Sequence, residues 1–303
     1  LARAGVFDDV DAVLHWHPSD RNSASPSSST ANKSGRFTFR GRAAHAASAP
    51  ERGRSALDGV EAMNYMVNLM REHVPQLARI HYVITDGGDA PNIVPEQAQV
   101  YYYVRHPKPS QVKNLFKRVV KAAEAAAMGT ETEVAVEVMH GNYPVMPNHT
   151  LARVVHENLV SLGGIRYDQA EQTFAENIQA SFQVQRLALG SERQIQPYAF
   201  RQGMGSTDVG DVSWLVPTVG FTIATWVPGT SAHSWQAVAA GGMSIGHKGM
   251  HLASKLLAQT AVDLIQSPEL IAAATEELQR SQGPGFKYAA LLGDRLPPLD
   301  YRR

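Results

Sequence analysis

Residues 35–45 read GRFTFRGRAAH, and this stretch sets the pattern of the segment that follows it. Residues 35–41 are strand-like and end at a glycine, and His45 then lies among small residues. Farther on, apolar side chains recur at the spacing of one helix face; they are Leu57, Val60, Met63, Val67, Met70 and Val74. A β-strand followed by an amphipathic helix is therefore predicted, with His45 in the connection.

The same reading extends over residues 33–141. Further strands are predicted at 79–85, 97–104 and 132–139, and a second helix is predicted to start near Ser110, after Pro109. The resulting order is β-α-β-β-α-β, which is typical of a ferredoxin-like α+β sandwich. We expect residues 33–141 to form one domain.

The flanking segments 1–32 and 142–303 predict a second, α/β domain that is interrupted by the first. A short strand over residues 12–14 leads to His17, a buried-type strand is expected at 218–223, and a helix at 149–163. The stretch RNSASPSSSTANKSG at 21–35 has the composition of a linker. Residues 164–203 show no clear pattern, and either helices or a long excursion is expected there.

Composition excludes several classes of protein. The 303 residues contain 28 Lys and Arg against 28 Asp and Glu, which argues against a nucleic-acid protein or a polybasic membrane binder. The absence of cysteine excludes disulfides and thiolate metal sites. There is no apolar run of about 20 residues that spans a membrane and no signal-peptide layout. A soluble, cytoplasmic protein is predicted.

Two loop histidines are candidate metal ligands. His17 follows one predicted strand and His233 another, and sites in α/β sheets form where loops leave the carboxyl ends of strands. Neutral imidazole is a standard zinc ligand. The alternative is two unrelated loop histidines, because no local HExxH-type motif is present. The roles of His15, Asp208 and Asp211 stay open, the aspartates as metal ligands or as helix caps.

Three further residues are candidates for contact with a substrate. His45, on a small-residue turn, suits an oxyanion-stabilising role, and the alternative is a polar turn residue. Arg105 suits a carboxylate, and the amide of Asn92 is expected beside it on the same anion. Taken alone, Arg105 also fits a solvated residue on a strand.

Together these segments resemble a known superfamily, the di-zinc metallopeptidases, aminoacylases and amidohydrolases with an inserted dimerisation lid. The resemblance runs from near residue 6 to near residue 250, and TDVGDVSW and HSWQ point to its aminobenzoyl-glutamate hydrolases. It rests on FDDVDAVLHWHP, GRAAHAASAPERGRSALD, PNIVPEQAQVYYYVR, GSTDVGDVSW, TSAHSWQ and SIGHKGM.

The resemblance implies a role for each candidate. His17 and His233 resemble ligands of two divalent metal ions, zinc or manganese. His45 resembles the lid histidine that reaches the partner subunit's active site, and Asn92 and Arg105 resemble the residues that hold the substrate's terminal carboxylate, also across the dimer. The strand reads Tyr-Val-Arg here where many relatives have Asp-x-Arg.

The resemblance also implies an activity, metal-dependent hydrolysis of aminoacyl- or aroyl-glutamate amides such as p-aminobenzoyl-glutamate. The partner is expected to be a second copy or a related subunit, through the lid at 33–141. The family's general base and remaining ligands lie upstream of the segment that resembles residues 1–20, and the only Glu-Glu pair here is Glu276-Glu277. We expect an N-terminally incomplete catalytic domain and an inactive chain. The alternative is a catalytically dead, dimerising module that binds carboxylates.

Overall fold

The computed structural model describes residues 1–184 and 187–296, and the chain divides into two compact units. The first, which we call the α/β unit, comprises residues 1–28, 146–203 and 212–287. The second, the lid unit, comprises residues 29–145, 204–211 and 288–296. The predicted fold class, an α/β domain with an inserted α+β domain, is confirmed.

The lid unit is built on a four-stranded antiparallel sheet with strand order β4-β5-β3-β6. The order along the chain is β-α-β-β-α-β, as the sequence predicted, although the first strand starts earlier than residue 35. The elements are β3 (Ala31–Arg40), α1 (Ala56–Met70), β4 (Arg79–Asp86), β5 (Gln97–His106), α2 (Pro109–Gly129) and β6 (Glu133–Asn142).

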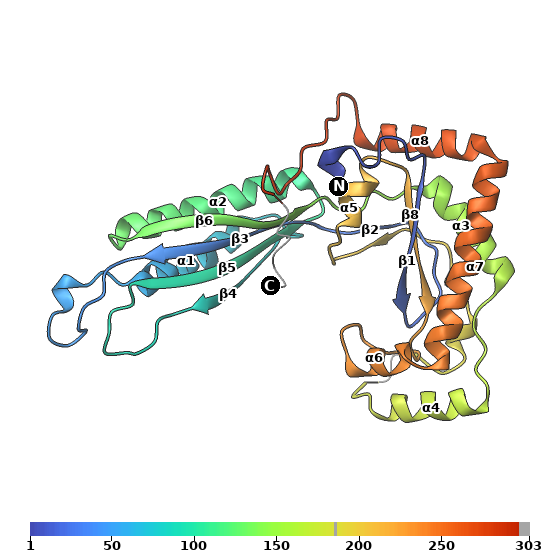
Figure 1. Cartoon of the computed structure of the whole chain (residues 1–303), viewed down its shortest axis with the longest axis horizontal. Helices are drawn as coiled ribbons and strands as arrows, with labels where there is room; N and C mark the ends of the chain where they lie inside the picture. The colour runs from blue at the N-terminus through green and yellow to red at the C-terminus, as the bar shows by residue number, and fades with distance from the viewer. Residues whose placement is uncertain (185–186, 297–303) are drawn as a thin grey trace. The chain divides into compact units, whose positions relative to one another are not determined.

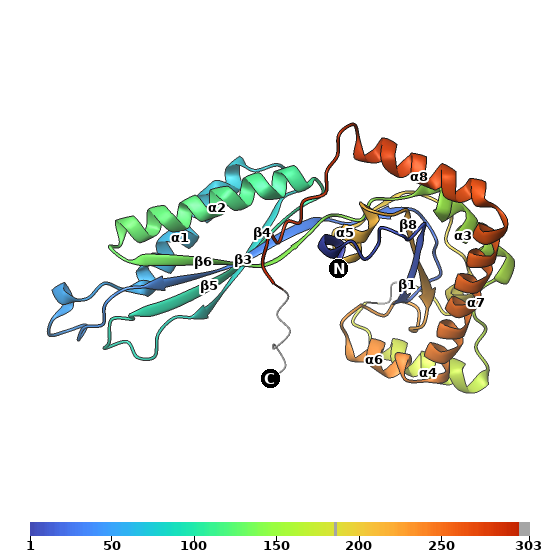
Figure 2. The ribbon, with the colours of Figure 1, turned by 45° about the horizontal axis from the view of Figure 1, so that its top comes forward.

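Helices α1 and α2 lie side by side on one face of this sheet (Figures 1 and 2). Alternate residues of each strand face them, because successive side chains of a strand point to opposite faces. Phe37 and Phe39 of β3 are fully buried in this way against the apolar faces of the helices, which include Val60 and Val119. Ser55 caps the start of α1 by accepting a hydrogen bond from the backbone N–H of Asp58.

The opposite face of the lid sheet, which we call the open face, carries the alternate residues of each strand that point away from the helices. Its side chains are polar and aromatic on β3 and β5, and Val83 of β4 adds an exposed aliphatic side chain. Gln99 donates a hydrogen bond to Thr38 at 2.8 Å, and the rings of Tyr101 and Tyr103 lie 5.3 Å apart. Helices α1 and α2 both lie on the other face, and at the β6 side of this one Arg295 pairs with Glu137 at 2.8 Å.

The α/β unit is organised around two parallel strands, β1 (Val13–Ser19) and β8 (Thr218–Ala224), paired from Val13↔Thr218 to Ser19↔Ala224. Helices α3 (His149–Leu162) and α7 (Ser244–Gln266) pack on β8, and their apolar residues share one buried core with Phe221 and Ile223. Further helices are α4 (Gln169–Ala180), α6 (Trp235–Gly241) and α8 (Pro268–Gln282). Short helix α5 (Val209–Ser213) crosses a boundary between the units in the chain.

The serine-rich stretch at 21–35 is not a free linker, which corrects the interpretation from composition. Asn22 is fully buried, and its side-chain amide donates to the carbonyl of Glu192 at 2.7 Å. The region 164–203, for which helices or a long excursion were expected, contains helix α4, and its later part packs against this stretch. Strand β2 (Ser27–Ser28) of this stretch pairs with β7 (Arg201–Gln202). The 3-10 turns in the described residues are Ala2–Ala4, Pro50–Arg52, Arg71–His73 and Ser191–Arg193.

None of the helices in the described ranges, 1–184 and 187–296, combines the length and the apolar character needed to cross a membrane.

The alternation along β3 makes a stability prediction. Phe37→Ala removes a fully buried ring and should lower the free energy of unfolding by about 3–5 kcal/mol. Its neighbour on the open face, Thr38→Ala, loses one hydrogen bond and should cost about 1 kcal/mol. Denaturant unfolding followed by tyrosine fluorescence measures both, and equal losses would contradict the assignment of the two faces.

Candidate functional site

His17 lies near the carboxyl end of β1 with an exposed side chain. Its Nδ1 lies 2.7 Å from the carbonyl oxygen of Pro18. A carbonyl only accepts, so Nδ1 carries the proton and the lone pair is left on Nε2. A backbone carbonyl that fixes the tautomer in this way is the usual arrangement around a metal-binding histidine. The ring of Trp226 meets that of His17 edge-on at 6.5 Å.

His233 lies in the loop between β8 and α6. Because β1 and β8 are parallel, this loop and His17 both lie at the carboxyl end of the two-stranded sheet. His233 has a positive φ of 59°, which is uncommon for a residue other than glycine. The next residue, Ser234, caps α6 by accepting a hydrogen bond from the backbone N–H of Ala237. A hollow of about 380 Å³ beside this loop is lined by Trp235 among others.

These two histidines do not make a complete metal centre. Within residues 1–184 and 187–296, three or more His, Asp or Glu side chains do not gather anywhere in a group that could hold a metal ion. A catalytic zinc takes three protein ligands as a rule. The tautomer of His17 fits a ligand, but the donor set that the described residues supply does not fit a complete catalytic site.

Asp211 is occupied by structural hydrogen bonds. Its carboxylate accepts from the hydroxyl of Tyr288 at 2.6 Å and from the backbone N–H of Tyr143 at 3.2 Å. Burial raises the pKa of this carboxyl, and these hydrogen bonds oppose the rise. Asp208 accepts a long bond of 3.4 Å from Thr207. Asp211 therefore holds the segments of Tyr143 and Tyr288 together within the lid unit.

His45 lies in the loop between β3 and α1, exposed to solvent. The backbone N–H groups of Ala47 and Ser48 both donate to its Nδ1, each at 3.2 Å. Nδ1 is therefore unprotonated, and Nε2 carries the hydrogen. His45 thus presents a hydrogen-bond donor, the group that an oxyanion requires, whereas His17 presents a lone pair.

Asn92 lies in the loop between β4 and β5, which runs beside the loop of His45. His45 forms an isolated antiparallel bridge with Ile93, and the N–H of Ala46 donates to the carbonyl of Asn92 at 3.0 Å. Both loops lie at the same end of the lid sheet (Figures 1 and 2). The structure therefore brings His45 and Asn92 together.

Arg105 lies at the other end of that sheet, so one chain does not bring it beside Asn92 as the sequence suggested. Strand β5 starts at Gln97 near the Asn92 loop, and Arg105 comes eight residues later in it. At the rise of about 3.4 Å per residue of an antiparallel strand, the two positions are about 27 Å apart. The correction follows from the strand, whose extended backbone converts a short sequence separation into a long distance.

The surroundings of Arg105 suit an anion. Its guanidinium lies over the ring of Tyr103, 5.3 Å from the centroid. Its Nε is buried and has no hydrogen-bond partner in the described part of the chain, where Arg105 also has no carboxylate within ion-pair distance. Arg79 is its neighbour on β4, and the ring of His81 is diagonal to it. Residue-by-residue reading missed Tyr103, although its place two residues before Arg105 on a strand puts the pair on one face.

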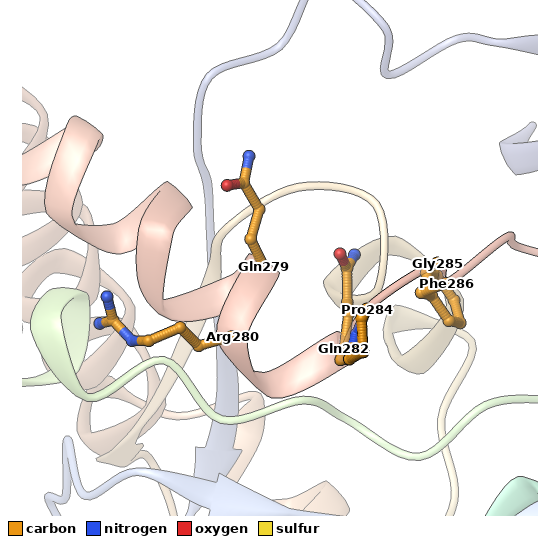
Figure 3. Close-up of a pocket in the computed structure, with 7 residues that line it drawn as sticks. Gln279, Arg280, Gln282, Pro284, Gly285 and Phe286 are labelled. Atoms are coloured by element: carbon orange, nitrogen blue, oxygen red, sulfur yellow. The ribbon is translucent and has the colours of Figure 1, made fainter.

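The hollow at the end of α8, about 420 Å³ in volume, is not part of this site (Figure 3). Its wall contains no histidine and no carboxylate, the groups that metal-assisted hydrolysis uses. The residues that line it are Gln279, Arg280, Gln282, Gly283, Pro284, Gly285 and Phe286.

The two tautomers are directly measurable. We expect the ring-nitrogen shifts of His45 at neutral pH to show a hydrogen on Nε2, because two backbone N–H groups occupy Nδ1. His17 should show the reverse, with the hydrogen on Nδ1. Long-range ¹H–¹⁵N correlation spectra of the histidine-labelled chain report this, with an acidified sample as the doubly protonated reference. The same tautomer at both positions would contradict the geometry.

His81 reports on the charge at the Arg105 end. Burial lowers the pKa of His81 from its usual 6.5, and the nearby guanidinium of Arg105, followed by those of Arg71 and Arg79, lowers it further. The folded chain therefore binds fewer protons than the unfolded chain, so His81 subtracts from stability as the pH falls below 6.5. Arg105→Ala should raise the pKa of His81 in an NMR titration. Arg40→Ala, at the opposite end of β3, is the control, and equal curves for both variants would contradict the placement.

Comparison with known proteins shows which of them this chain resembles. Residues 29–131 match the family model described as the peptidase dimerisation domain. The chain is 37% identical, over 92% of its length, to one of the subunits of p-aminobenzoyl-glutamate hydrolase from Escherichia coli, and it spans 64% of that protein. It is 29% identical, again over 92% of its length, to the mouse Xaa-Arg dipeptidase, of which it spans 58%. The chain thus covers less than two thirds of the relatives it matches.

Solved structures share the fold. The aminobenzoyl-glutamate utilization protein of Klebsiella pneumoniae aligns with a TM-score of 0.54 at 19% identity, over 86% of this chain and 56% of that one. A hydantoinase/carbamoylase-family amidase of Burkholderia vietnamiensis aligns with a TM-score of 0.54 at 13% identity, over 88% of this chain and 55% of that one. Residues 29–131 therefore match the peptidase dimerisation domain, and the chain is similar over 92% of its length to longer proteins named as a hydrolase subunit and a dipeptidase.

Proposed function

We propose that this chain belongs to a metal-dependent amide hydrolase that acts on aroyl- or aminoacyl-glutamate amides such as p-aminobenzoyl-glutamate. The observation that carries the proposal is the fixed donor at His45, held on a loop that touches the loop of Asn92. Hydrolysis of an amide develops negative charge on the carbonyl oxygen, and a preorganised N–H stabilises that charge in the transition state. The hydrolase names of the relatives support the same reaction class.

Arg105 and Asn92 are proposed to bind the carboxylate end of the substrate. A guanidinium pairs with a carboxylate through two parallel hydrogen bonds. Among the described residues, no Asp or Glu side chain forms an ion pair with Arg105, so its guanidinium is available to a ligand. The ring of Tyr103 beneath it limits the motion of the guanidinium. Together these features favour substrates that end in a free carboxylate, such as glutamate amides.

Because His45 and Arg105 lie at opposite ends of one lid, we propose that two chains build each site. A substrate the size of p-aminobenzoyl-glutamate does not bridge the roughly 27 Å that β5 sets between the two ends. In a dimer, the His45 and Asn92 loops of one copy would meet the Arg105 end of the other. The partner is proposed to be a second copy of this chain or a related subunit, and the dimerisation-domain match supports an assembly of this kind.

His17 and His233 are proposed as two of the metal ligands. A divalent metal of the zinc type would supply an activated water and polarise the amide carbonyl. The described residues do not complete its coordination. We expect residues 1–303 alone to bind such a metal weakly and to show no turnover.

A second candidate is a module without activity that dimerises and binds carboxylates. The observation in its favour is that the anion-binding end, with Arg105 over Tyr103, lies wholly within the lid, whereas the described residues do not assemble a group of metal ligands. Such a module would bind glutamate amides without any metal.

Calorimetric titration of the chain with p-aminobenzoyl-glutamate tests the binding proposal. Arg105→Ala should weaken binding about 10- to 100-fold, because a hydrogen-bonded charge pair contributes about 1.5–3 kcal/mol. Arg36→Ala is the matched control, since Arg36 lies on the same open face but faces Glu137 at 3.8 Å.

The same samples separate the two candidates. Product release that a chelator abolishes would show an active metal enzyme and would overturn the expectation that 1–303 is inactive. Binding that survives the chelator and vanishes in Arg105→Ala supports the module. Unchanged affinity in Arg105→Ala would refute the carboxylate role in either case.

A further inference from the structure

Asn32 is directly opposite Arg105 across the β3–β5 ladder. It is only 5% exposed, and its Oδ1 has no hydrogen-bond partner within the described ranges. The Nε of Arg105 is likewise buried and unpartnered there. A buried acceptor and a buried donor are thus left open on paired residues, although buried polar groups are nearly always satisfied in folded proteins.

Both side chains lie on the open face of the lid. The next residue, Lys33, points the other way, since its Nζ lies over the ring of Phe116 of α2 at 5.2 Å. Its partner on β5, Val104, is fully buried on the helix side. Residues opposite each other in an antiparallel pair share a face, with Cβ atoms about 4.5–5.5 Å apart. That spacing lets an amide oxygen reach a guanidinium Nε by a small change of rotamer.

The neighbours leave this acceptor to Arg105, because Asn142, opposite Asn32 on β6, donates its side-chain N–H groups to the carbonyls of Tyr143 and Thr207. On the other side of β5, Arg79 uses its Nη1 to donate to the carbonyls of Gln76 and Ala78, at 2.9 and 2.7 Å. Tyr103 contacts Arg105 through its ring face and not through an acceptor lone pair. Asn32 therefore offers a neutral acceptor at the base of the guanidinium, on the side of Nε.

We propose that Asn32 is a positioning residue for Arg105. Its Oδ1 accepts the Nε–H of Arg105 when a carboxylate occupies the two terminal nitrogens, so that the guanidinium is fixed with its fork toward the ligand. This inference rests on the proposed carboxylate role of Arg105. A neutral amide suits the task because it orients the cation without neutralising it, whereas an aspartate at 32 would form its own ion pair with Arg105 and compete with the ligand.

Two substitutions and one spectrum test this role. Asn32→Leu keeps the approximate shape and removes the acceptor, and should weaken binding of p-aminobenzoyl-glutamate about tenfold, the effect of losing one hydrogen bond to a charged group. Asn32→Asp should weaken it further. Asn68→Leu is the matched control, because the Oδ1 of Asn68 accepts from the Nε of Arg71 at 3.0 Å on α1, away from the open face.

The spectrum uses the unaltered chain and so does not depend on the folding of a variant. In arginine-labelled protein, saturating p-aminobenzoyl-glutamate should slow solvent exchange of the Arg105 Nε–H several-fold, and the slowing should be absent in Asn32→Leu. A merely structural asparagine would not change this exchange. Wild-type affinity in Asn32→Leu, or an Nε–H whose exchange ignores the ligand, would overturn the inference.

The outcomes also distinguish a failure of the Asn32 role from a failure of the carboxylate role of Arg105. If the chain binds the ligand and loses it in Arg105→Ala, but Asn32→Leu and Asn32→Asp behave like Asn68→Leu, only the role of Asn32 is overturned. If Arg105→Ala binds as the unaltered chain does, both the carboxylate role and the role of Asn32 fail.

Discussion

The antiparallel pairing of β3 with β5, from Ala31↔His106 to Arg40↔Gln97, is the constraint on which the rest of this structure depends. A continuous ladder of extended backbone cannot bend enough to bring its two ends together, so the side chains at those ends belong to separate places. The His45 and Asn92 loops are at one end and Arg105 at the other. On the proposed function, a site that uses all three needs two lids, and dimerisation would then be part of the chemistry.

The local backbone decides what each histidine offers. Two amide N–H groups point at the Nδ1 of His45 and leave a donor on Nε2, whereas the carbonyl of Pro18 takes the Nδ1 hydrogen of His17 and leaves a lone pair. The same side chain thus suits an oxyanion in one loop and a metal in another. These assignments come from short contacts within three residues, and the fold only has to hold each loop in place.

Periodicity predicted the lid well because its elements are regular. The helix spacing around Val60 and the strand over residues 79–85 follow from local patterns that tertiary structure reinforces, and both are present. Composition failed at residues 21–35, where serine and asparagine suggested a linker. Those side chains are buried instead, because Asn22 and its neighbours satisfy the backbone of residues 192–205 through contacts that no local pattern encodes.

The sequence offers candidate residues for a site but not their arrangement in space. Sequence patterns singled out His17, His45 and Arg105. They also suggested that Asn92 and Arg105 act together. The distance between those two depends on the strand that separates them, and the acceptor at Asn32 depends on the register of a strand sixty or more residues away. Long-range pairing of this kind is what one sequence does not reveal.

The most direct test of the two-chain site is a distance measured between copies. The chain has no cysteine, so Ser48→Cys beside His45 and Gln76→Cys near Arg79 each provide a single position for a spin label. Pulsed electron spin resonance would compare a doubly labelled chain, diluted with unlabelled protein, with a mixture of the two singly labelled chains. The account predicts a 48–76 distance between copies that is shorter than the distance within one chain. A mixture that shows no such distance, or only a longer one, would contradict it.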